Sequence, residues 1–155
     1  MTTIPLFFTF DEHYVVPALV AFHSLLAHAD RQDRYRLHVL HPGISDRARR
    51  RIASVVGRFD HGEVVFHDTS MYEAELASCG GKSHFSKEIY FKLCAPTLFP
   101  ECDRIICSDV DVVFTGDVSK AYFAYPDEDF YYAGHRHNHQ HGERNPQGQT
   151  HLLVQ

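Results

Sequence analysis

The chain has 155 residues and a mass of 17.8 kDa, which suits a single domain. Hydrophobic residues make up 44%, so we expect a buried core and exclude disorder, collagen and coiled coil. The formal charge of −5 argues against general nucleic-acid binding. We expect no transmembrane segment and no signal peptide, because no apolar run approaches about 20 residues and the N-terminus lacks a basic segment. These features predict a cytoplasmic protein with four reduced cysteines.

The charges are unevenly distributed along the chain. Residues 31–58 contain eight of the fifteen basic side chains. Residues 101–129 contain eight acidic side chains and only two basic ones. An acidic run of this kind is either a solvated face or a cation site, and the spacing of its carboxylates has to distinguish the two.

Strand and helix patterns alternate along the chain. Short apolar runs predict strands at residues 4–10, 36–41, 63–67, 104–108 and 130–133, and residues 112–114 read as extended. Apolar spacings of three and four predict helices at 14–28 and at 46–59, the second capped by Ser45. Weaker helical signals lie at 71–76 and after Ser86, where Pro96 should end or bend the helix. The alternation predicts an α/β fold, with a mostly parallel sheet and helices on both faces.

The composition changes at His135. Residues 135–155 are polar and rich in histidine, without hydrophobic periodicity. We therefore expect a domain over residues 1–134 and a polar tail or loop over 135–155. The alternating His135, His137, His139 and His141 would share one face of an extended chain and could bind a metal such as Zn²⁺, Ni²⁺ or Cu²⁺; the alternative is a disordered tail.

The most informative motif is Asp109-Val110-Asp111, which directly follows the apolar run Ile105-Ile106-Cys107. In an extended chain, residues two apart point to the same side, so both carboxylates should face one space. That space lies beyond the carboxyl end of a parallel strand, where open α/β sheets bind ligands. Two converging carboxylates favour a hard divalent cation such as Mn²⁺ or Mg²⁺, which can also hold a diphosphate. The alternative is a pair of turn aspartates that cap the next element.

A second candidate region is the end of the first predicted strand, Phe8-Thr9-Phe10-Asp11-Glu12-His13-Tyr14. A carboxylate and exposed backbone at a strand end can hydrogen-bond a base edge, and a tyrosine ring can stack on the base. The alternative is an ordinary helix start with Asp11 as its cap.

The two regions, in this order and spacing, resemble glycosyltransferase family 8, whose members include lipopolysaccharide galactosyl- and glucosyltransferases and glycogenin. The likeness also includes residues 38–45 and the stretch from Tyr90 to Val113, and covers about residues 4–133. The family has the GT-A fold, a Rossmann-like fold for nucleotide-diphospho-sugar transferases. The resemblance implies a metal-dependent transfer of a hexose from UDP-galactose or UDP-glucose to a glycan or lipopolysaccharide acceptor, with retention of configuration.

The resemblance also implies roles for individual residues. Asp109 and Asp111 would ligate Mn²⁺ or Mg²⁺, with Asp109 also near the donor. The other donor-binding positions would be Thr9, Phe10, Asp11, His13, Tyr14 and Lys92. Lys92 is also placed to pair with Glu88 one helical turn earlier. No catalytic nucleophile is evident.

The family pattern continues beyond the Asp-x-Asp motif with an acceptor region and a C-terminal histidine that completes the metal site. This sequence lacks both, so we expect a fold truncated at its C-terminus. That leaves open whether the chain transfers sugar or only binds donor, and whether a histidine of the tail replaces the missing ligand. A truncated sheet also predicts homo-oligomers as one possible state. A peripheral association with the inner membrane is the alternative to a free cytoplasmic location.

Two other functions are compatible with the motif. In a haloacid-dehalogenase-type phosphatase, Asp109 would be the nucleophile and Asp111 the acid; such a motif normally opens its domain, whereas here 108 residues precede it. The third reading is a non-catalytic module that binds a nucleotide sugar or a metal.

Overall fold

A computed structural model describes residues 1–70 and 95–124, all of which belong to one compact unit, Met1–Ala124. The elements in chain order are β1 (Thr3–Thr9), η1 (Glu12–Tyr14), α1 (Val15–His28), β2 (Arg34–His41), α2 (Asp46–Val56), β3 (Gly62–Asp68), α5 (Ala95–Leu98), β4 (Ile106–Cys107) and α6 (Ser119–Tyr122). The expected elements at 71–76, after Ser86 and at 130–133 lie outside the described residues.

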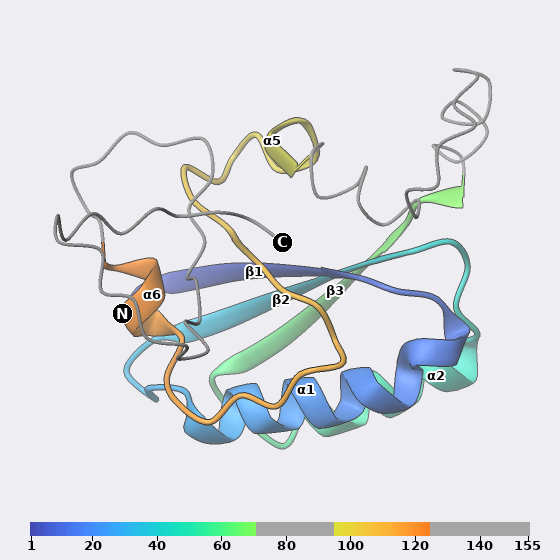
Figure 1. The fold of residues 1–155 in the computed structure, drawn as a ribbon, viewed down its shortest axis with the longest axis horizontal. Helices are drawn as coiled ribbons and strands as arrows, with labels where there is room; N and C mark the ends of the chain where they lie inside the picture. The colour runs from blue at the N-terminus through green and yellow to red at the C-terminus, as the bar shows by residue number, and fades with distance from the viewer. Residues whose placement is uncertain (71–94, 125–155) are drawn as a thin grey trace, which may run out of the picture. The chain divides into compact units, whose positions relative to one another are not determined.

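The described strands form one sheet in the order β3-β2-β1-β4, and every neighbouring pair is parallel. Figure 1 shows β1, β2 and β3 side by side. The parallel α/β prediction is therefore confirmed. Strand β4 is shorter than the predicted 104–108, because only Ile106 and Cys107 pair with β1. Residues 112–114 form no strand. Strands β2 and β3 lie on one side of β1, and β4 lies on the other. The strand order therefore reverses at β1.

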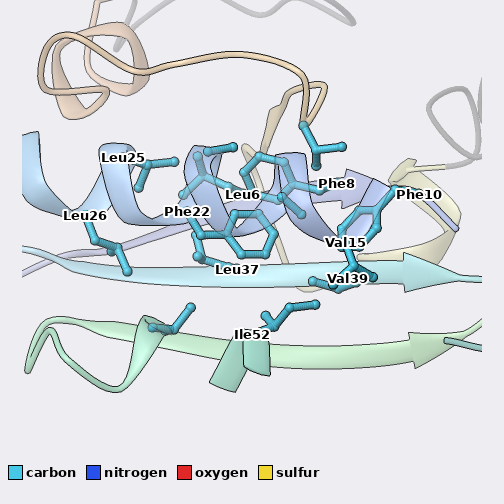
Figure 2. Packing of buried hydrophobic residues seen from close by; sticks show 14 of the residues in the cluster. Leu6, Phe8, Phe10, Val15, Phe22, Leu25, Leu26, Leu37, Val39 and Ile52 are labelled. Carbon is cyan, nitrogen blue, oxygen red and sulfur yellow. The ribbon is translucent and has the colours of Figure 1, made fainter. Parts of the chain in front are cut away.

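Helices α1 and α2 cover one face of the sheet (Figure 1). The alternate residues Leu6 and Phe8 of β1 point to this face, as do Leu37 and Val39 of β2, because side chains alternate along a strand. Phe22 of α1 packs edge-on against Phe8, with ring centroids 4.8 Å apart (Figure 2). Residues 1–70 and 95–124 contain no helix with the length and apolar character needed to cross a bilayer.

The opposite face of the sheet is covered by the segment that follows α5. Phe99 packs with Phe7 of β1 and Leu40 of β2 in a second apolar cluster, and the Phe7 and Phe99 rings are 5.7 Å apart. Strand β1 is therefore buried on both faces, which explains why its sequence is a continuous apolar run. Leu98 of the one-turn helix α5 also packs against this cluster, so the prediction of helices on both faces is confirmed.

The turn between β2 and α2 is held by a buried histidine. The Nδ1 atom of His41 accepts hydrogen bonds from the amides of Gly43 (3.0 Å) and Ile44 (3.2 Å). Gly43 has φ of +112°, a conformation that favours glycine. The predicted cap is confirmed, since the Ser45 hydroxyl accepts a hydrogen bond from the Ala48 amide. This turn fixes the start of α2 beside the carboxyl end of β1.

Candidate functional site

The candidate site lies at the carboxyl ends of β1 and β4. These strands are parallel neighbours, and the ladder between them extends to a hydrogen bond from the Ser108 amide to the Phe7 carbonyl, 3.3 Å long. Asp109 follows directly, while β1 ends at Thr9 and leads into Asp11. The two regions singled out in the sequence thus leave the same edge of the sheet on adjacent strands. Because β1 is where the strand order reverses, this is the edge at which open α/β sheets bind ligands.

The Asp-x-Asp segment alternates in exposure. Val110 is buried, only 4% exposed, and belongs to the main core, whereas Asp109 and Asp111 on either side of it are exposed. Val110 therefore anchors the segment, and the flanking carboxylates are accessible to a ligand. Two accessible carboxylates suit a hard divalent cation. No group of three potential metal-ligating side chains occurs among residues 1–70 and 95–124, so these two acids would provide only part of a coordination shell.

The end of β1 presents a partly exposed Thr9 and an exposed Tyr14, whose side chain is 49% exposed. The Asp11 carboxylate accepts a hydrogen bond of 2.9 Å from the His13 amide and caps η1, so the capping interpretation of Asp11 is confirmed. Phe10 is buried, and its ring lies 6.2 Å from that of Phe22. Only the backbone of Phe10 is therefore available to a ligand.

Glu12, which the sequence analysis did not single out, connects this region to α2. Its carboxylate accepts hydrogen bonds of 2.8 Å from both the amide and the hydroxyl of Ser45. These bonds, first that of the amide and then that of the hydroxyl, lower the pKa of Glu12. The start of η1 is thus fixed to the N-cap of α2, and η1 carries His13 and Tyr14.

The segment after Asp111 is held by two contacts between residues that are distant in the chain. The amide of Phe114 donates a hydrogen bond of 3.0 Å to the Ser24 hydroxyl of α1. The hydroxyl of Tyr35 donates one of 3.0 Å to Asp117. These two contacts position the Asp-x-Asp segment through the residues that follow it. No local pattern in the sequence predicts the roles of Ser24, Tyr35 and Asp117.

Some of the predicted positions cannot be placed. Lys92 and the histidines at 135, 137, 139 and 141 lie outside the described residues, as do Cys79 and Cys94. The described Cys102 is a free thiol. The structure therefore brings together Thr9, Asp11, Tyr14, Asp109 and Asp111 at one sheet edge.

Known structures show the same fold. A WbbM bifunctional glycosyltransferase matches with a TM-score of 0.67 and 23% identity, over 77% of this chain and 20% of that one. The mouse xyloside xylosyltransferase 1 matches with a TM-score of 0.58 and 20% identity, over 81% of this chain and 48% of that one. The galactosyltransferase LgtC, in complex with donor and acceptor sugar analogues, matches with a TM-score of 0.56 and 23% identity, over 83% and 43%. These are GT-A glycosyltransferases, and the chain matches their N-terminal portion.

Sequence comparison agrees with the fold. General stress protein A of Bacillus subtilis (strain 168) is 29% identical over 113 residues, which are 71% of this chain and 38% of that protein. The chain thus spans less than half the length of this relative and of each of the three structures. The model of the family described as glycosyl transferase family 8 matches residues 5–152, nearly the whole chain. The chain therefore belongs to glycosyl transferase family 8.

Proposed function

We propose that this chain binds a UDP-sugar at the carboxyl ends of β1 and β4, together with a Mn²⁺ or Mg²⁺ ion held by Asp109 and Asp111. The observation that carries the proposal is the parallel pairing of β1 with β4, since it brings the Thr9–Tyr14 region and the Asp-x-Asp segment to one sheet edge. The exposure of both acids on either side of the buried Val110 supports a shared ligand. Membership of the family supports the transferase over the phosphatase alternative.

Each group at this edge has a role that follows from its chemistry. The exposed Tyr14 ring offers a stacking surface for the uracil. Thr9 and the Asp11 carboxylate, whose Oδ1 atom also caps η1, offer hydrogen-bonding groups to the base. His13 is exposed beside them. Lys92 would contact the donor, as the resemblance to the family implies. A divalent cation bound there supplies positive charge that offsets the repulsion between the acids and the donor diphosphate, and stabilises the departing UDP.

The reaction we propose is transfer of a hexose, from UDP-galactose or UDP-glucose, to a glycan or lipopolysaccharide acceptor with retention. Support comes from the family and from LgtC, a galactosyltransferase solved with donor and acceptor sugar analogues. Because the chain spans less than half of its relatives, the transfer step needs its own test. Release of UDP from each donor, measured with and without a sugar acceptor, distinguishes a transferase from a module that only binds donor.

Calorimetry tests the donor site. UDP should bind in the presence of Mn²⁺ and much more weakly with a chelator. Asp109→Asn and Asp111→Asn should each abolish the dependence on metal, because each removes one negative ligand. Asp103→Asn is the matched control, since Asp103 is an exposed acid of the same acidic run before β4 and should leave binding unchanged. Equal UDP affinity with and without metal would contradict the proposed site.

A further inference from the structure

A surface on the far side of α1 and α2 from the sheet combines aliphatic and basic side chains. We call it the α1–α2 face and define it by the residues Val16, Val20, Arg47, Arg50, Arg51 and Arg58. All six side chains are exposed. Helices α1 and α2 pack side by side on the same face of the sheet (Figure 1), so the two kinds of side chain belong to one surface.

The α1 part of this surface lacks charge. Helix α1 contains no Asp, Glu, Lys or Arg over its 14 residues, although one side of it faces outward. Val16 is 57% exposed and Val20, one turn later, is 50% exposed. A helix that faces water normally carries charged groups on its outer side. Apart from the exposed imidazoles of His23 and His28, the outer side of α1 is thus suited to a surrounding less polar than water.

The α2 part carries a net positive charge, since α2 contains four arginines and a single acid, Asp46, one turn before Arg50. Arg47, Arg50 and Arg51 are three and four residues apart, so they lie on one side of the helix and repel each other. Arg47 is also in the first turn, where the helix dipole disfavours a cation. Within residues 1–70 and 95–124, none of the α2 arginines forms a salt bridge. A negatively charged partner would relieve this repulsion.

Two shallow grooves join the aliphatic and basic parts. One, of about 390 Å³, lies between Leu19 of α1 and the arginines at 47, 50, 51 and 58. The other, of about 280 Å³, is lined by Val16, Arg47, Arg51 and Glu12. Glu12 is the acid in that groove, and its carboxylate is engaged by Ser45. Aliphatic side chains and guanidinium groups therefore line the same grooves, where one partner can contact both.

We propose that the α1–α2 face docks on an anionic phospholipid surface. The arginines would contact lipid phosphates while the valines enter the boundary between headgroups and acyl chains, the two contributions that bind interfacial helices. An acidic protein or a nucleic acid would satisfy the arginines but would leave the uncharged outer side of α1 without a matching surface. This inference does not depend on the donor site, because none of its six residues is assigned to UDP-sugar binding.

Vesicle binding of the whole chain tests the proposal. The protein should bind vesicles of phosphatidylcholine mixed with phosphatidylglycerol and should bind phosphatidylcholine vesicles weakly, and added salt should weaken the binding. Arg47→Gln combined with Arg51→Gln should reduce binding about 30-fold, since each arginine near an anionic surface contributes about a factor of five. Arg31→Gln combined with Arg34→Gln is the control, because it removes equal charge at exposed positions before and at the start of β2.

A fluorescent reporter tests the orientation independently of charge. The chain contains no tryptophan, so Val20→Trp introduces a single reporter on the α1–α2 face. Its emission should shift to the blue when anionic vesicles are added. Phe123→Trp, at a site 46% exposed just after α6, should show no shift.

Several results would overturn the proposal. These are equal binding to neutral and anionic vesicles, equal losses in the two double arginine variants, and an unshifted Val20→Trp emission. Binding to RNA or heparin without binding to vesicles would assign the face to an acidic macromolecule instead. If the Arg47/Arg51 variant does not fold, as judged by circular dichroism, Arg50→Gln combined with Arg58→Gln makes the same test on the same face.

Discussion

The Nδ1 atom of His38 lies 2.9 Å from the Nε2 atom of His67, and the two imidazole rings stack between neighbouring strands β2 and β3. Both rings contact Phe99, with centroids 4.7 and 5.6 Å from its ring. This contact holds the segment that leads from α5 into β4, and therefore the approach to Asp109. One imidazole donates and the other accepts, so the accepting ring must be neutral and the two rings cannot both be protonated while the bond is kept.

The histidine pair predicts a loss of stability in mild acid. Burial, and then the charges of His67 and Arg36, lower the pKa of His38 to about 4 from the ordinary value of 6.5, while the acids Glu101 and Glu63 oppose the shift. Burial lowers the pKa of His67, which Glu101 opposes. The folded state therefore resists a proton that the unfolded chain accepts. The contribution to stability is full above about pH 6.5 and is lost as the pH falls toward about 4, by about 3 kcal/mol for His38.

Urea unfolding at about pH 7 and about pH 5 measures this loss. His38→Asn should flatten the acid dependence, because asparagine does not titrate. His23→Asn is the control, since His23 is an exposed histidine of α1 and should leave the dependence as it is. An unchanged acid dependence in His38→Asn would contradict the prediction.

The link between Glu12 and Ser45 predicts coupled effects on stability. Ser45→Ala removes the cap of α2 and should cost about 0.5–2 kcal/mol. Glu12→Ala removes the acceptor of two hydrogen bonds from the same serine, so the double variant should lose less than the sum of the single losses. Because these bonds lower the pKa of Glu12, its contribution is present above the ordinary value of 4.5 and is lost as the pH falls through the lowered one.

Thermal unfolding of the two single variants and the double variant tests this coupling. Ser54→Ala, at an exposed serine in the last turn of α2, should change stability very little. Strictly additive losses would show that Glu12 and Ser45 act independently.

The hydrogen bond from Tyr35 to Asp117 contributes to a raised pKa of the Tyr35 hydroxyl. Burial, and then Asp117, raise the pKa of Tyr35 to about 12 from 10. The stabilisation from the neutral hydroxyl is therefore full below about pH 10 and is lost as the pH rises through about 12. Tyr35→Phe should cost about 1–3 kcal/mol, because the Asp117 carboxylate and the Asp30 amide each lose a partner.

Ultraviolet absorbance against pH follows the eight tyrosines of the chain. Tyr35→Phe should remove one phenol that ionises near pH 12. Tyr14→Phe is the control, because Tyr14 is exposed and its substitution should leave both that step and the stability unchanged. If the step near pH 12 persists in Tyr35→Phe, another tyrosine is responsible for it.

The exposed Tyr14 ring predicts a specific effect on donor binding. Tyr14→Ala should weaken UDP binding in the presence of Mn²⁺ by about 10-fold, since stacking of an aromatic ring on a base contributes about 1–3 kcal/mol. Tyr14→Phe keeps the ring and should bind like the unaltered chain. Calorimetry of both variants measures the effect, and equal affinities for Ala and Phe would exclude a stacking role.

The sequence by itself determined the elements whose signals are local. The continuous apolar run of β1, the spacing of apolar residues in α1 and the Ser45 cap of α2 each depend on neighbours a few residues away, and all three are found as expected. The order of strands and helices likewise sufficed to predict a parallel sheet covered on both faces, and the Asp-x-Asp motif pointed to its edge.

Only the tertiary structure decided what depends on residues distant in the chain. It limited β4 to two residues, because pairing requires a partner on β1, and it buried the Phe10 ring against Phe22. Tyr35 and Asp117 are 82 positions apart, and Glu12 and Ser45 are 33 apart. A local pattern predicts whether a segment forms a helix or a strand and which of its sides is buried. It does not predict which side chains of a distant segment will contact it. For that reason the sequence could predict that both candidate regions follow strands of a parallel sheet, and only the fold could identify the contacts that hold them in place.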